Sequence, residues 1–348
     1  MKRIAAPALA GILLTLTAGA GESPAKDDAV RLYFPTTNHH LLDDEEQFYQ
    51  ATIEKRSFGG HYGFVRSTES GPNPHYYNIF HMGLDIRPVQ RDANSEPLDP
   101  VLAAADGRVA YVNNDPSKSN YGRYVKLFHQ FPGGEVCTTY GHLSRVTVSA
   151  GQNVKAGERL GIMGYTGPGI NKERAHVHFE FGFRTLPDYA GWYDKYGVKM
   201  GLEGKNLHGE YNGMNYIGID SAPILIATAK GRPLTMKQIF GNLHPVLRVR
   251  VPAGKDFFYW QKCWPWMVVG GLQQKQPRSW EIDCDRMGIP LKFTPSDVAV
   301  SGPELIWFDN SLTTQEAFTR GIVEKRNGQR VLAKTGLRWF SQLTYLGD

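Results

Sequence analysis

The segment Ala175-His176-Val177-His178-Phe179-Glu180-Phe181-Gly182-Phe183 alternates between two kinds of side chain. Such alternation predicts a β-strand with one face in a hydrophobic core and the other available for chemistry. The core face would hold Val177, Phe179, Phe181 and Phe183, and the other face would hold His176, His178 and Glu180. Two histidines at positions i and i+2 lie about 6.6 Å apart at Cα on one face. One can bind a metal while the other reaches a water molecule on that metal, which indicates a hydrolytic metal site.

A second segment, His81-Met-Gly-Leu-Asp85-Ile86, also alternates and places His81 and Asp85 on one face. A fully extended chain would hold these two residues roughly 13 Å apart. That is too far for one ion with ligand bonds of about 2 Å, so the chain must bend, and Gly83 permits a bend. The same spacing occurs in His39-His40-Leu-Leu-Asp43-Asp44, without the glycine or the alternation. We interpret that second cluster as a solvated acidic segment.

A third element, Thr139-Tyr-Gly-His142-Leu143, follows the hairpin signal Pro132-Gly133-Gly134. In order and spacing, the three elements resemble the lysostaphin-like or LytM-type zinc endopeptidases, which cut peptidoglycan peptides. The resemblance runs from about Gly59 to Arg184. It implies one zinc ion per chain and a peptidoglycan peptide as substrate.

The resemblance also implies roles for five residues. The implied zinc ligands are His81, Asp85 and His178, and the implied catalytic residues are His142 and His176. Two imidazoles and one carboxylate leave an open coordination position, which is typical of a catalytic zinc site. We assign proton transfer to His176 and stabilisation of the oxyanion to His142, although the two roles could be exchanged. Glu180 either orients a histidine or faces solvent.

Two loops depart from the family pattern. The segment from Tyr165 to Ala175 is longer than the short run that precedes the H-x-H motif in many relatives, and residues 90–99 form a polar insertion after the metal motif. Both should alter the walls of the cleft. Substrate preference therefore cannot be transferred from the family.

Residues 1–20 have the composition of a signal peptide. Lys2 and Arg3 precede an apolar run from Ile4 to Leu16, and small residues end the segment. The run is too short for a comfortable transmembrane helix, and no cysteine follows it for lipidation. We expect an exported protein, periplasmic or extracellular, without a transmembrane segment after leader removal. The formal charge of +5 is too diffuse to predict a nucleic-acid partner, and the oligomeric state stays open.

The chain has three cysteines, which in an exported protein allow one disulfide and one remaining thiol. Cys263 and Cys284 lie in one β-rich region, so we predict a bridge between them. Cys137 should be a buried core thiol.

Short apolar runs separated by turn residues predict a mostly β fold. We expect an antiparallel β-sheet peptidase core with an appended all-β C-terminal domain, of sandwich type, and a few short helices. The helices are expected near Glu45–Lys55 and Thr235–Phe240, and a hairpin at Asn327-Gly328. The expected organisation is a signal peptide (1–20), a lead-in segment (21–58), the peptidase domain (59–184), a mixed connecting region (185–244) and the C-terminal domain (245–348).

The leading hypothesis is an exported zinc metalloendopeptidase that hydrolyses stem peptides or cross-links of peptidoglycan with a zinc-activated water. One rival is a non-catalytic relative that binds the wall or activates another hydrolase. The other rival is an exported metal-binding module without hydrolytic activity, which leaves His142 and His176 unexplained. The implied ligand set is complete, which favours catalysis.

Overall fold

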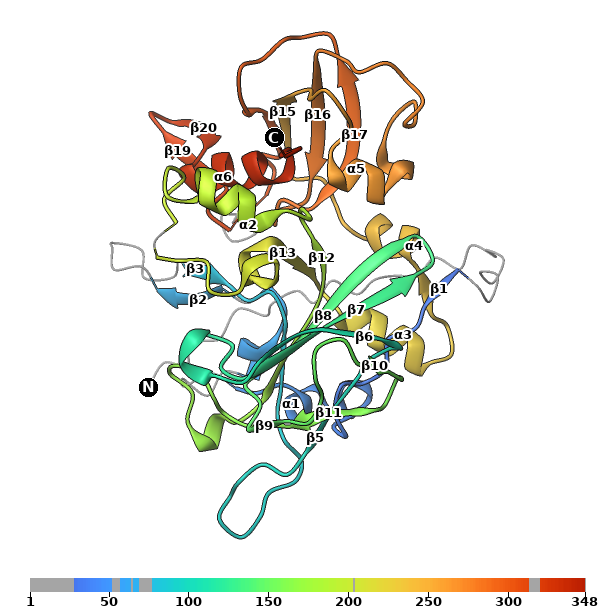
Figure 1. The fold of residues 1–348 in the computed structure, drawn as a ribbon, viewed down its shortest axis with the longest axis vertical. Helices are drawn as coiled ribbons and strands as arrows, with labels where there is room; N and C mark the ends of the chain where they lie inside the picture. Colours follow the sequence, from blue (N-terminus) through green and yellow to red (C-terminus); the bar gives the residue numbers. More distant parts are fainter. Residues whose placement is uncertain are drawn as a thin grey trace, which may run out of the picture.

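The computed structural model describes residues 28–51, 57–63, 65–68, 77–202, 204–312 and 320–347. The expected signal peptide lies outside these residues. Antiparallel strands dominate the fold and the helices are few and short (Figure 1), which confirms the predicted fold class. Within the described residues, no helix is both long and apolar enough to cross a membrane.

A seven-stranded sheet forms the centre of the molecule. Its strands follow the order β10-β6-β7-β8-β12-β13, and β4 pairs with β12 beside this path. Their bounds are Asn153–Val154 (β10), Gly107–Asn113 (β6), Tyr124–Phe131 (β7), Gly134–Gly141 (β8), Val177–Arg184 (β12), Tyr216–Ile219 (β13) and Leu84–Ile86 (β4).

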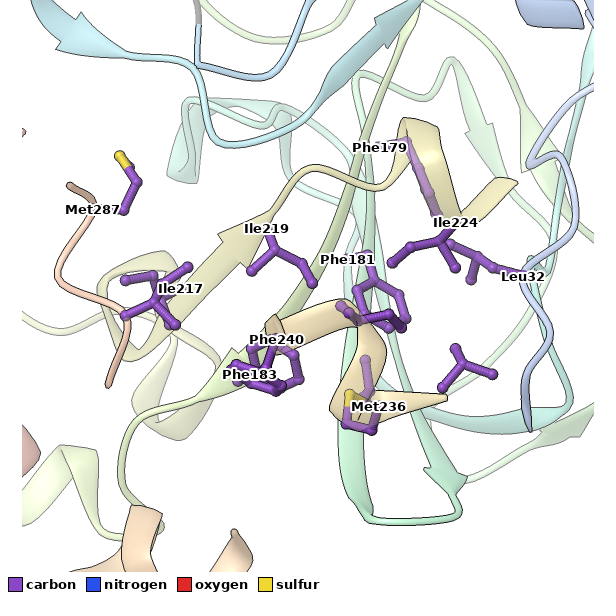
Figure 2. Packing of buried hydrophobic residues seen from close by; sticks show 14 of the residues in the cluster. Leu32, Phe179, Phe181, Phe183, Ile217, Ile219, Ile224, Met236, Phe240 and Met287 are labelled. Carbon is purple, nitrogen blue, oxygen red and sulfur yellow. The ribbon is translucent and has the colours of Figure 1, made fainter. Parts of the chain in front are cut away.

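Strand β12 carries His178 and the alternating phenylalanines, and it has neighbouring strands along both edges. It pairs with β8 along one edge, and with β4 and then β13 along the other. Its alternate phenylalanines are fully buried and pack among Ile217, Ile219, Ile224, Met236 and Phe240 (Figure 2). Each fully buried phenylalanine contributes roughly 1.5–3 kcal/mol of hydrophobic stabilisation. The predicted core face of this strand is confirmed.

Smaller sheets surround the central one. Strands β5 (Pro100–Leu102), β11 (Arg159–Ile162) and β9 (Arg145–Val146) form a three-stranded sheet, and β2 (Val65–Thr68) pairs with β3 (Tyr77–Phe80). In the lead-in segment, β1 (Ala29–Val30) pairs with β14 (Leu234–Thr235). The lead-in therefore packs into the common core through Val30 and Leu32, not only against itself.

The helices between the sheets are short. They are α1 (Glu45–Phe48), α2 (Tyr189–Trp192), α3 (Ala222–Ala229) and α4 (Met236–Gly241). Thr235 and Gln238 form a capping box at the start of α4, which confirms the predicted capped helix. Helix α1 ends at Phe48, well before the expected Lys55, and residues 52–56 lie outside the described part of the chain.

The main sheet of the C-terminal region has four strands, β17-β16-β15-β18, and the other strands described in this region form only a two-stranded hairpin, so the expected sandwich of two packed sheets is wrong. The strands are Pro290–Ser296 (β17), Ser279–Cys284 (β16), Leu247–Pro252 (β15) and Glu304–Phe308 (β18). Trp260 of α5 (Tyr259–Cys263) and Trp264 of this region pack against Phe183 of β12, with ring centroids 5.8 and 5.3 Å apart. The hydrophobic core consequently runs without interruption from the seven-stranded sheet into this region.

The last two strands and a helix complete the chain. Strands β19 (Val323–Arg326) and β20 (Gln329–Leu332) form the predicted hairpin, and α6 (Lys334–Leu343) follows it. Both turn residues have positive φ, 51° at Asn327 and 79° at Gly328, as a two-residue type I′ turn requires.

The three cysteines are all free, so the predicted Cys263–Cys284 disulfide is wrong. Cys284 ends β16 and is buried opposite Leu247 of β15. Cys263 ends α5, where its thiol lies near Tyr259 and Arg184. The shared β-rich region therefore does not bring the two thiols together. Cys137 is buried in β8, as expected.

Candidate metal centre and its cleft

Strand pairing brings the predicted metal ligands together. His178 of β12 lies directly opposite Asp85 of β4 and, on the other side, directly opposite Gly141 of β8. Residues opposite each other in an antiparallel pair point to the same face of the sheet. His81 lies between β3 and β4, just before Asp85 in the chain. Two segments far apart in sequence thus meet on one face.

The three side chains converge to within bonding range of a single ion. His81 Nε2 lies 2.9 Å from Asp85 Oδ1 and 3.2 Å from His178 Nδ1, and His178 Nδ1 lies 2.8 Å from the same carboxylate oxygen. All three residues are buried. In the described part of the chain, no other group of three His, Cys, Asp or Glu residues converges in this way. Two imidazole nitrogens and one carboxylate oxygen are a donor set that suits zinc.

The rival cluster near the N-terminus has a different character. His40 Nδ1 lies 3.0 Å from Asp43 Oδ1, and both side chains are exposed. Together with His39 and Asp44 it forms no converging group of three. The interpretation of this segment as a solvated surface is consistent with that arrangement.

Gly83 permits a close approach of two segments. A Cβ atom at this position would lie 2.6 Å from the Phe179 carbonyl oxygen and 2.9 Å from Cε1 of His178. The φ angle of Gly83 is not positive, so any residue could adopt its backbone conformation. The glycine is required because the His178 ring occupies the space that a side chain would fill.

Hydrogen bonds to the remaining nitrogens orient the two ligand histidines. His81 Nδ1 donates to the backbone oxygen of His61 over 2.7 Å, which leaves the Nε2 lone pair of a neutral ring facing the site. His178 Nε2 lies 3.0 Å from Glu180 Oε1, and Tyr121 donates its hydroxyl proton to the same oxygen over 2.7 Å. Glu180 is buried, so of the two alternatives for this residue, the structure favours orientation of a histidine.

The electrostatics of the site favour a cation. Burial lowers the pKa of His178, but hydrogen bonds to Asp85 and Glu180 outweigh burial and raise the pKa to about 9. Burial raises the pKa of Glu180, but the His178 bond and the nearby positive groups lower it to about 2. The two carboxylates therefore stabilise positive charge at His178, and a metal ion would replace the proton there.

His142 and His176 lie beside the three converging residues. Their ring centroids are 4.7 Å apart, and His176 Nε2 lies 3.4 Å from Asp85 Oδ1. His142 Nδ1 lies 2.8 Å from the Thr166 carbonyl oxygen, and His176 Nδ1 lies 2.7 Å from that of Arg174. A carbonyl oxygen can only accept, so each Nδ1 carries the proton and each Nε2 of a neutral ring carries a lone pair. The structure thus brings all five predicted site residues together.

His142 has an unusual backbone conformation. It directly follows β8 and has a φ of 64°, which costs a residue other than glycine of the order of 1–3 kcal/mol. Burial lowers the pKa of His142 well below its ordinary value, and the neighbouring His176 and His178 lower it further. The strained turn therefore holds a neutral imidazole beside the three candidate metal ligands.

The two loops that depart from the family pattern contact each other. Lys172 forms an ion pair of 2.7 Å with Glu96, and Tyr165 donates to the same carboxylate over 3.2 Å. Arg91 donates to the Lys172 carbonyl oxygen over 3.0 Å. The insertion after β4 and the segment before β12 consequently form one joined surface next to His176.

A cavity of about 970 Å³ opens on the site. Its lining includes His81, His178 and Glu180, together with Tyr121 and one face of α6. Neither α6 nor its contribution to the cleft is predicted from the sequence. The i, i+3, i+4, i+7 spacing of Thr335, Arg338, Trp339 and Gln342 is the signal that could have identified this helix face.

Residues 80–187 match Peptidase family M23. The M23 match covers both metal motifs and both catalytic candidates, and it confirms the resemblance stated from the sequence. Three similar proteins illustrate it. Peptidoglycan DD-endopeptidase ShyA of Vibrio cholerae is 36% identical over 88 residues, which cover 25% of this chain and 18% of ShyA. Murein hydrolase activator NlpD of Escherichia coli is 31% identical over 84 residues, which cover 24% of this chain and 20% of NlpD.

The third is a solved structure, the catalytic domain of the antimicrobial peptidase lysostaphin from Staphylococcus simulans. It is 28% identical, with 35% of this chain and 75% of that domain covered and a TM-score of 0.24. The chain thus spans about a fifth of the length of the two curated M23 relatives named above. It is similar to peptidoglycan-associated proteins that include both an endopeptidase and an activator.

Proposed function

We propose that this protein is an exported zinc metalloendopeptidase that hydrolyses peptide bonds in peptidoglycan stem peptides or cross-links. The observation that carries the proposal is the buried convergence of His81, Asp85 and His178 with two further histidines beside it. A metal-binding module needs only the first three residues. The additional pair supplies the proton transfer and charge stabilisation that hydrolysis requires.

The donor set fits one zinc ion, held by His81, Asp85 and His178. When bound, zinc supplies Lewis acidity and lowers the pKa of water, which makes a nucleophile available near neutral pH. We assign proton transfer to His176, because its Nε2 lone pair faces the ligand group and its ring is oriented through Nδ1 by the Arg174 carbonyl oxygen. We assign stabilisation of the developing oxyanion to His142, which the Thr166 carbonyl oxygen orients in the same way.

The second candidate function is activation of another wall hydrolase, or wall binding without catalysis. The similarity to Murein hydrolase activator NlpD favours it. A relative that lacks the zinc ligands would be expected to act without catalysis, as an activator or a wall-binding protein. In this chain the complete set of five residues supports catalysis instead.

Digestion of purified peptidoglycan sacculi by the mature protein separates these functions. We expect release of soluble fragments, loss of release with a chelator, and recovery on addition of zinc. A His178→Ala variant of equal thermal stability is the matched control. If metal-loaded protein releases no fragments alone but accelerates an added wall hydrolase, the activator function replaces the endopeptidase.

A further inference from the structure

The cavity at the candidate metal centre has a wall that lies outside the M23 match. This wall comes from the end of the chain: Arg320 and one face of helix α6, with Thr335, Arg338, Trp339 and Gln342. The M23 match ends at residue 187, so these residues are a feature of this chain and not of the matched domain. The C-terminal region therefore shapes the same cavity as His81 and His178.

Helix α6 is firmly attached to the rest of the molecule. Trp339 donates its indole N–H to the Gly288 carbonyl oxygen over 2.8 Å, and Gln342 donates to the Met214 carbonyl oxygen over 3.0 Å. Trp339, Phe340 and Leu343 are buried in the core. The helix face that lines the cavity is consequently held in one position, as a wall that recognises a ligand must be.

The lining of this cavity is strongly basic. It includes Lys205, Arg320 and Arg338, and also Lys118, which is ion-paired with Asp115 outside the lining; the one carboxylate of the lining is that of Glu180. The Glu180 carboxylate already accepts hydrogen bonds from His178 and Tyr121. The wall formed by the C-terminal region therefore presents positive charge that the lining itself does not balance.

The two arginines have no carboxylate partner among the described residues. In that part of the chain the ion-paired arginines are Arg184, Arg248, Arg250 and Arg326. Burial lowers the pKa of Arg320 to about 10, and Tyr62 and Asp285 oppose this shift, but the Asp285 carboxylate accepts hydrogen bonds from the backbone N–H groups of Met287 and Ile289. It forms no ion pair with Arg320 in the structure.

Arg320 is directed toward the metal motif. Its Nη1 lies 3.3 Å from Met82 Sδ, and Met82 directly follows His81. The guanidinium carbon lies 5.0 Å from the centroid of the Trp339 ring, and Trp339 is adjacent to Arg338 in α6. Stacking on an aromatic face orients a guanidinium while its N–H groups remain available to an anion.

We propose that Arg320 and Arg338 bind a free carboxylate group of the peptide substrate and so determine which peptides are cleaved. This inference rests on the proposed function, since it places the substrate in the cavity that opens on His81 and His178. A planar guanidinium matches a carboxylate through two parallel hydrogen bonds, and Arg is better suited to this than Lys. The bound carboxylate would hold the peptide while the scissile bond lies at the metal centre.

The test compares native sacculi with sacculi whose free carboxylates have been converted to amides. Wild-type protein should cleave amidated sacculi about tenfold or more slowly, because a charge-assisted hydrogen bond is lost. On native sacculi, Arg338→Gln should cleave more slowly than wild type by a similar factor, because its KM is higher. Amidation of the sacculi should slow this variant little further. Arg338→Lys should recover part of the loss, and Arg320→Lys should behave like a weaker form of Arg338→Gln. Zinc content and thermal stability should match wild type.

Arg326→Gln is the matched control, because it removes one exposed positive charge from the same region outside the cavity. It should respond to amidation as wild type does. If Arg338→Gln and wild type lose the same factor on amidation, the inference is overturned while the proposed function stands.

A protein that binds the peptide carboxylate without cleaving the peptide is detected by equilibrium binding of soluble peptidoglycan peptides in acid and amidated forms. Suppose that the protein cleaves nothing, but that wild type binds the acid form more tightly and Arg338→Gln does not. This result would support the carboxylate site and refute the proposed endopeptidase activity. Equal binding of both forms by wild type would refute the carboxylate site.

Discussion

Asp85 and His178 are directly opposite each other in the β4–β12 pair, and their side chains meet with Asp85 Oδ1 2.8 Å from His178 Nδ1. The register of one strand pair thus sets the distance between two candidate ligands. A shift by one residue would turn His178 to the core face and place Val177 or Phe179 at the site. Burial of the phenylalanines on the other face of β12 opposes such a shift. Their packing therefore keeps His178 on the face that holds Asp85.

The first prediction concerns the metal. The purified mature protein should contain about one zinc ion per chain, since three protein ligands and an open position form a catalytic site. His81→Ala and His178→Ala should each lose most of this zinc, as measured by elemental analysis after dialysis. His40→Ala is the control and should retain it. Full occupancy in a His81→Ala, His178→Ala double variant would assign the metal to another site.

The second prediction separates metal binding from turnover. His142→Ala and His176→Ala should keep zinc, because neither side chain belongs to the converging three. Each should lose about 10²-fold or more in kcat on sacculi, as expected for an acid–base or oxyanion group. A variant with wild-type kcat would show that its histidine takes no part in the reaction.

The third prediction concerns Glu180. Glu180→Gln keeps an acceptor for His178 Nε2 but removes the negative charge, so zinc affinity should fall about 10- to 100-fold. Competition with a chromogenic chelator measures this change. Tyr121→Phe removes one hydrogen bond to Glu180 and retains the charge, so its effect should be smaller. Unchanged affinity in Glu180→Gln would mean that its carboxylate does not support His178.

The fourth prediction concerns the dependence of stability on pH. His129 is buried in β7, where its ring contacts the Asp106 carbonyl oxygen and the Thr138 hydroxyl. Burial lowers the pKa of His129 to about 4. The unfolded chain, with a pKa of about 6.5, takes up the proton first as pH falls, so this residue reduces the free energy of unfolding between about pH 6.5 and pH 4.

The variant His129→Gln isolates that contribution. It should be less stable than wild type at pH 7, because it disturbs two buried hydrogen bonds. The difference between the two proteins should shrink by about 3 kcal/mol as pH falls to about 4, because only wild type loses the His129 contribution. Urea unfolding at several pH values measures this difference. A difference that stays constant with pH would show that His129 titrates normally in the folded protein.

Local patterns in the sequence were sufficient to predict much of the site. The alternation around His178 is a local feature, and the strand that it predicts occurs in the structure. The chain also bends at Gly83, but the glycine is needed there for space beside His178 and not for backbone freedom. The strand register and the positive φ of His142 were not predictable, because both depend on strands distant in sequence. Propensity and periodicity describe a segment but not its partner.

The incorrect predictions also arise because a local pattern does not reveal which distant segment a residue packs against. Cys263 and Cys284 share a β-rich region, yet one ends a helix and the other faces the core of a sheet. The expected sandwich does not form, and α5 with its tryptophans packs against the central sheet instead. Helix α6 was missed because its apolar residues were attributed to an all-β region, although its periodicity is helical.

The position of β12 also determines when the candidate metal site is complete. His178 follows Asp85 by 93 positions and His81 by 97 positions, so no early part of the growing chain holds a complete ligand set. The site comes into existence only when β12 docks between β4 and β8, a long-range pairing that forms slowly. In the proposed site, zinc would therefore meet its full set of ligands only after this pairing has formed. If the protein is exported, as proposed, and crosses the membrane unfolded, the zinc site would form, and zinc would be acquired, only at its destination.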